Sequence, residues 1–145
     1  MPLGPRCTAA RRRSIVTCRR ATQVCSRVSA ASRALALAKR RLAAAKRAYD
    51  VAERKCRAAR RACVLARQRA ATAKRQADAL RARSVLICRN ATRVCRLTVV
   101  PKKRYLAAKT SYNTALRNHN AAKRACTVAR RACIRARQVA SRTCR

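Results

Sequence analysis

Ten cysteines are the residues of this chain whose type and spacing most directly suggest chemistry. Eight of them form four Cys-x6-Cys segments, and the other two lie near the chain ends. Two cysteines seven residues apart on a helix are about 10.5 Å apart along its axis, too far for a mutual disulfide or a shared zinc ion. Because they share one face, each segment needs an antiparallel partner. The disulfide candidates are Cys7, Cys18, Cys25, Cys56, Cys63, Cys88, Cys95, Cys126, Cys133 and Cys144.

The cysteine positions allow several pairings, and the local one is favoured. In the local pairing each half of the chain closes on itself, with the bonds Cys18–Cys63, Cys25–Cys56, Cys88–Cys133 and Cys95–Cys126. In a long-hairpin pairing the chain reverses once near residue 75, with the bonds Cys18–Cys133, Cys25–Cys126, Cys56–Cys95 and Cys63–Cys88. Both pairings join Cys7 to Cys144. Bonds between chains and ten reduced, buried thiols remain as alternatives.

The four Cys-x6-Cys segments resemble those of the twin Cys-x-n-Cys helical hairpins, in which two disulfides join two antiparallel helices. The spacing of six differs from the three or nine that is usual in that group. The resemblance covers the cysteine segments only, and it implies a scaffold without a particular activity.

A 70-residue repeat and a seven-residue pattern predict the elements that position the cysteines. Adding 70 to 18, 25, 56 and 63 gives the cysteines of a second copy, so we expect an N-terminal segment 1–13 and repeats 14–83 and 84–145. Alanine recurs every seven residues from 31 to 73 and from 108 to 136. The sequence therefore predicts an all-α fold, a tandem duplication of a disulfide-stapled antiparallel hairpin, as a four-helix bundle or a long antiparallel coiled coil.

Several single residues refine this expectation. Ser14, Ser29 and Ser84 are candidate N-caps, and Pro101 suits a first helical turn. In the local pairing a turn falls near residue 40, although the alanine row crosses it without a change of phase. We expect Tyr49, Tyr105, Tyr112 and His119 to pack in the seam, and Asp50 and Glu53 to pair with Arg54 and Arg57.

The charge balance indicates a polyanionic partner. Forty bases, 32 of them arginine, face three acids, and the formal net charge is +37. Arginine binds phosphate through a planar fork of donors, and no recognition helix, zinc finger or aromatic RNA-binding motif stands out. We expect a structural protein that binds and packages DNA without sequence preference. The candidate contacts form one outward heptad row: Arg33, Arg40, Arg47, Arg54, Arg61, Arg117, Arg124 and Arg131.

Other classes of function fit the composition poorly. The acids are Asp50, Glu53 and Asp78, the only histidine is His119, and the only glycine is Gly4, so we expect no catalysis, cofactor, metal site or small-molecule substrate. Neither a transmembrane run nor a secretory signal is expected. Disulfides imply an oxidising environment, such as a virion or a chromatin-like compartment. The alternative function is a minor capsid or cement protein of a large DNA virus, which would bridge acidic capsid subunits. A homo-oligomer is compatible with either function.

Overall fold

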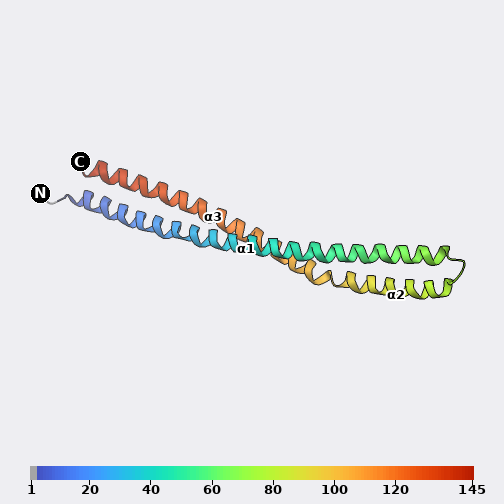
Figure 1. Cartoon of the computed structure of the whole chain (residues 1–145). Helices are drawn as coiled ribbons and strands as arrows, with labels where there is room; N and C mark the ends of the chain where they lie inside the picture. Colours follow the sequence, from blue (N-terminus) through green and yellow to red (C-terminus); the bar gives the residue numbers. More distant parts are fainter. Residues whose placement is uncertain (1–2) are drawn as a thin grey trace. The chain divides into compact units, whose positions relative to one another are not determined.

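The computed structural model describes residues 3–145 and contains three helices (Figure 1). Helix α1 spans Pro5–Thr72, α2 spans Ala77–Arg96 and α3 spans Val99–Thr143. Over the described residues the chain has no strand, which confirms the all-α prediction. Alanine, arginine, lysine and leucine dominate the helices because they lose little freedom in helical conformation.

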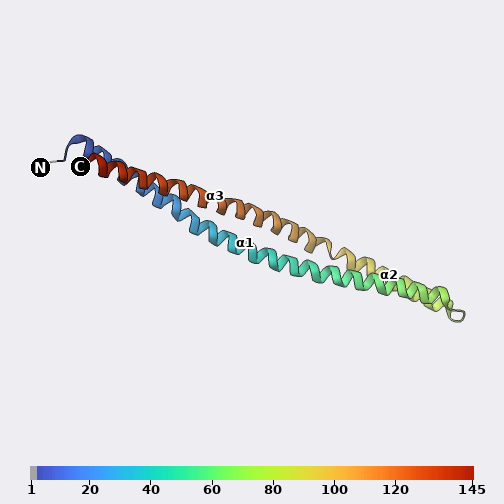
Figure 2. The same ribbon diagram turned by 90° about the horizontal axis from the view of Figure 1, so that it is seen from above.

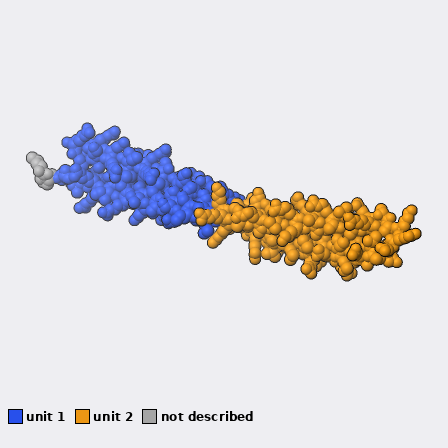
Figure 3. Space-filling model, in the orientation of Figure 1, with its two compact units in different colours: residues 1–38, 112–145 blue, residues 39–111 orange. Residues whose placement is uncertain are grey.

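The chain divides into two compact units (Figure 3). Unit 1 takes residues 1–38 and 112–145, where the first half of α1 lies antiparallel to most of α3. Unit 2 takes residues 39–111, where the second half of α1 lies antiparallel to α2 (Figure 2). Each unit combines residues from both of the expected repeats, so the units cut across the boundary predicted at residues 83–84. The duplication itself remains a sequence prediction.

Five disulfides follow the long-hairpin pairing. Unit 1 holds Cys7–Cys144, Cys18–Cys133 and Cys25–Cys126. Unit 2 holds Cys56–Cys95 and Cys63–Cys88. Cα atoms of the bonded cysteines are 4.5–4.8 Å apart, and no cysteine is free. The close approach is possible because the neighbouring seam residues are mostly alanines, whose small side chains allow two backbones to come together.

The favoured local pairing is therefore wrong, and so are the four-helix bundle and the alternative of ten reduced thiols. Helix α1 continues through residue 40 without a turn, so Cys18 and Cys25 cannot meet Cys63 and Cys56 of the same helix. The unbroken phase of the alanine row is the physical reason, because one continuous apolar seam favours one continuous helix. The interchain alternative is not needed, since every cysteine has a partner within the chain.

The chain reverses at residues 73–76, between α1 and α2. Gln76 has a φ of 59° and a ψ of 24°, which places it in the left-handed region. A residue with a side chain pays a steric cost of about 1–2 kcal/mol there. No side-chain cap bonds to the first turn of α2. The reversal is thus a tight turn built without glycine, asparagine or proline.

Pro101 explains why the returning arm is split into α2 and α3. The proline ring would clash with the carbonyl of Leu97, four residues earlier, in an uninterrupted helix. The chain makes a turn at residues 97–98, and Pro101 lies in the first turn of α3, as expected. Position 31 in α1, 70 residues earlier, is alanine, and α1 has no break there. The predicted caps were wrong, because Ser14 and Ser29 lie inside α1 and Ser84 lies inside α2.

Alanine and cysteine form the interior of both units. The buried apolar residues are Cys7, Ala21, Cys56, Ala70, Ala91, Cys126 and Ala140. Each alanine of the two predicted rows, 31–73 and 108–136, is half-buried, as the heptad pattern predicts. Many larger apolar residues are instead exposed, and Val16 and Leu97 retain 66% and 67% of their accessible surface. The disulfides therefore join helices that share only a narrow apolar contact.

Candidate polyanion-binding surface

The eight arginines of the predicted outward row are all exposed. Four of them belong to unit 1, namely Arg33, Arg117, Arg124 and Arg131. The other four belong to unit 2, namely Arg40, Arg47, Arg54 and Arg61. Neighbours within the row are seven residues apart, which is about 10.5 Å along a helix. Exposed guanidinium groups at this regular spacing can contact successive phosphates of a nucleic-acid strand without reading its bases.

Few of these bases are neutralised within the chain. Glu53 accepts a bond of 3.0 Å from Arg57, as predicted, and Asp78 lies 3.9 Å from Arg81, a pair that was not predicted. The expected pair between Asp50 and Arg54 does not form among residues 3–145. Both observed pairs are exposed, and such pairs contribute little to stability. None of the eight row arginines has a carboxylate partner in the described chain, so their charge faces solvent.

The aromatic residues and the histidine pack within the units and do not form a separate site. The rings of Tyr49 and Tyr105 stack with centroids 5.7 Å apart and planes 8° from parallel. This agrees with the expectation of packing in the seam and leaves these two rings unsuited to stacking on bases. Nε2 of His119 lies 3.0 Å from the Ser32 hydroxyl, across the helix pair of unit 1. The histidine thus has a protein partner, as predicted.

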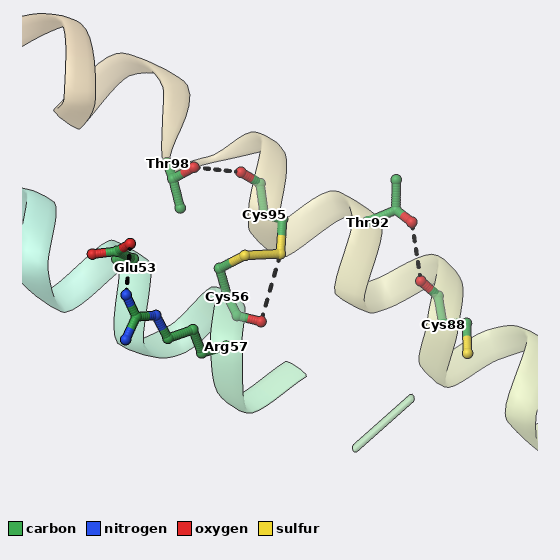
Figure 4. Close-up of a disulfide and its surroundings, with 7 residues drawn as sticks. All are labelled: Glu53, Cys56, Arg57, Cys88, Thr92, Cys95 and Thr98. Carbon is green, nitrogen blue, oxygen red and sulfur yellow. Dashed lines mark hydrogen bonds and ion pairs between the residues drawn. A yellow bond between two sulfur atoms is a disulfide. The ribbon is translucent and has the colours of Figure 1, made fainter. Parts of the chain in front are cut away.

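The cysteine segments repeat one local arrangement (Figure 4). Thr92 donates its hydroxyl proton to the Cys88 carbonyl at 3.2 Å, and Thr22 does the same for the Cys18 carbonyl at 3.2 Å. Sγ of Cys95 lies 3.5 Å from the carbonyl oxygen of its partner Cys56, which is a contact and not a hydrogen bond, since a disulfide sulfur carries no proton. Thr98 donates to the Cys95 carbonyl at 2.7 Å, beside the break before α3.

Four arginines outside the outward row lie beside the disulfides and were missed. Arg60 and Arg67 line a groove in unit 2, and Arg130 and Arg137 line a groove in unit 1. They fall in the heptad row next to the predicted one. The identical sequence Ala-Arg-Arg-Ala-Cys at 59–63 and 129–133 was a signal that could have identified Arg60 and Arg130.

No protein-family model, curated protein or solved structure matches this chain. Among residues 3–145, none of the helices has a stretch that is both long and apolar enough to pass through a bilayer. The same residues contain no group of three potential metal ligands. The five disulfides within the chain are compatible with an oxidising environment.

Proposed function

We propose that this protein binds nucleic acid through its arginine rows, without sequence preference, and helps to compact or package it. The observation that carries the proposal is the charge balance: 40 bases, three acids, and two of those acids already in ion pairs. Self-repulsion of this size destabilises a compact state, and a polyanion relieves it. DNA supplies about one negative charge per 1.7 Å of duplex.

The arrangement of the bases favours contact with phosphates over recognition of bases. The row arginines recur along α1 in both units and along α3 in unit 1, and they are exposed at regular intervals. Arginines spread in this way can neutralise the phosphate backbone of a nucleic acid. They do not form a single recognition helix that would enter a DNA groove and read its bases. The five disulfides hold the basic helices together despite their like charge. We place the protein in an oxidising compartment such as a virion or condensed chromatin.

The salt dependence of duplex DNA binding tests this proposal. A protein that contacts six to ten phosphates loses about 10³–10⁵ in affinity between 50 and 200 mM salt. Each row arginine replaced by glutamine should lower the slope of log affinity against log salt by about one, equally for DNA of any sequence. The measurement is a fluorescence-anisotropy titration of two unrelated duplexes. Equal affinity at both salt concentrations would contradict the proposal.

A further inference from the structure

Each unit contains a groove beside a disulfide, and the two grooves are built from equivalent residues. The unit 2 groove has a volume of about 480 Å³ and the unit 1 groove about 400 Å³. Arg60 and Arg67 of the unit 2 groove correspond to Arg130 and Arg137 of the unit 1 groove, 70 positions later. The two arginines therefore recur, although in unit 2 they lie on α1, the earlier helix of the pair, and in unit 1 on α3, the later one.

Four further lining positions agree, whereas Ser84, Val85 and Arg89 line only the unit 2 groove and Cys25 and Ile134 line only the unit 1 groove. The disulfide Cys63–Cys88 lines the unit 2 groove, and Cys18–Cys133 lines the unit 1 groove. Ala91 and Ala21, exposed by only 4% and 5%, lie at equivalent places in the two linings. Thr92 and Thr22 also line their grooves, and both hydroxyls bond to a cysteine carbonyl at 3.2 Å. The two helix pairs thus share six equivalent lining residues, two of them arginines.

The charge of the grooves indicates an anionic ligand. No carboxylate lines either groove, and neither Arg60, Arg67, Arg130 nor Arg137 takes part in an ion pair of the described chain. The two arginines on one wall are seven residues apart, or about 10.5 Å along the helix. The long side chains of two arginines at this spacing can reach separate phosphates of one nucleic-acid strand.

We propose that the two grooves are paired phosphate-binding sites, in which Arg60 with Arg67, and Arg130 with Arg137, hold phosphodiester groups of a nucleic-acid backbone against the disulfide. This rests on the proposed function and assigns it specific contacts outside the outward row. Bidentate bonds from guanidinium to phosphate supply the affinity. The disulfide fixes the opposite helix, so the groove keeps its width when it is empty.

The test compares two quadruple variants that lose the same four charges. The groove variant is Arg60→Gln, Arg67→Gln, Arg130→Gln and Arg137→Gln. The control variant is Arg11→Gln, Arg27→Gln, Arg41→Gln and Arg104→Gln, whose residues are exposed, divided equally between the units and outside both grooves. Circular dichroism and peptide mapping of the disulfides confirm that both have folded. We expect the groove variant to bind a 12-base-pair duplex about tenfold more weakly than the control.

A second measurement locates the ligand. In NMR titrations with inorganic pyrophosphate, the amide signals of Thr22 and Thr92 should shift in the wild type. Arg60→Gln with Arg67→Gln should abolish only the Thr92 shift, and Arg130→Gln with Arg137→Gln only the Thr22 shift. Equal DNA affinity of the two quadruple variants would overturn the assignment of the grooves while the proposed function stands. If the wild-type protein binds no DNA, the proposed function is wrong. The presence or absence of the pyrophosphate shifts at Thr22 and Thr92 then decides by itself whether the grooves bind phosphate.

Discussion

At the scale of single residues, alanine and cysteine replace the large apolar side chains that usually join helices. The buried residues are small, and no side chain of the described residues is fully buried. Alanine buries little apolar area, and burial stabilises by roughly 25 cal/mol per Å². The disulfides supply the remaining cohesion, chiefly by restricting the unfolded chain. Gln76 instead lowers stability, because it occupies the left-handed region at the reversal.

Replacing Gln76 should stabilise the protein. Glycine removes the steric cost of about 1–2 kcal/mol, and its greater freedom in the unfolded chain offsets roughly half of the gain. We expect Gln76→Gly to raise the free energy of unfolding by about 0.5–1 kcal/mol, measured by guanidinium chloride unfolding followed by circular dichroism. The matched control is Gln138→Gly inside α3, which should lower it by about 1 kcal/mol. A loss of stability in Gln76→Gly would contradict the conformation described for the turn.

At the scale of elements, one proline decides how many helices the chain has. The two long arms carry the same seven-residue pattern, yet α1 is continuous for 68 residues and the returning arm is broken at 97–98. The Pro101 ring and its missing N–H account for the difference. Like-charged neighbours on every helix oppose helix formation slightly, and the strong helix propensity of alanine outweighs them.

Exchanging the residues at positions 101 and 31 should move the break. In Pro101→Ala the new amide can bond to the Leu97 carbonyl, so we expect α2 and α3 to join and amide hydrogens from 97 to 101 to exchange more slowly. The reverse change, Ala31→Pro, should interrupt α1 and cost about 3 kcal/mol or more. Hydrogen exchange followed by NMR measures both effects. Unchanged exchange in Pro101→Ala would show that another residue causes the break.

The sequence predicted the elements better than their pairing. Heptad rows correctly indicated helices, the half-buried alanines and the exposed arginines, because these follow from local periodicity. The prediction of helix N-caps was wrong because the sequence pattern around Ser14 and Ser84 is helical on both sides of each serine. The sequence did not determine which cysteines are bonded, because Cys63 and Cys133 are preceded by the same residues. Cys18 would therefore meet an equivalent surface in the bond Cys18–Cys63 and in the bond Cys18–Cys133. The turn position decides between them, and Lys74, Arg75 and Gln76 carry no usual turn signal.

At the scale of the whole molecule, the five disulfides are nested within one another along the chain. Their sequence separations are 25, 39, 101, 115 and 137 residues, from the reversal outwards. Once Cys63–Cys88 has formed, for example, Cys56–Cys95 closes a loop that contains only the residues between the two bonds on each arm of the chain. The total stabilisation is therefore smaller than the sum of five isolated loops, each worth about 3–5 kcal/mol. The nesting also implies an order of formation.

Oxidative refolding should begin at the reversal. Closing the 25-residue separation of Cys63–Cys88 costs about 1.4 kcal/mol less entropy than closing the 115-residue separation of Cys18–Cys133, or roughly a tenfold difference in population. We expect Cys63–Cys88 as the main early species, and Cys25–Cys56 and Cys95–Cys126, with separations of 31 residues each, as the main incorrect bonds between different Cys-x6-Cys segments. Acid trapping and nonreducing peptide mapping identify both. Early accumulation of Cys7–Cys144 would contradict this order.

The narrow alanine and cysteine interior has a consequence for temperature. Unfolding exposes apolar surface to water, and this exposure gives most proteins a large positive change in heat capacity of about 12–15 cal/mol/K per residue. Here the native chain already exposes residues such as Val16, Leu86 and Leu97, so unfolding adds less apolar surface and the heat-capacity change is smaller. We therefore expect a broad curve of stability against temperature, on which the free energy of unfolding changes less with cooling or heating than in most proteins of this length.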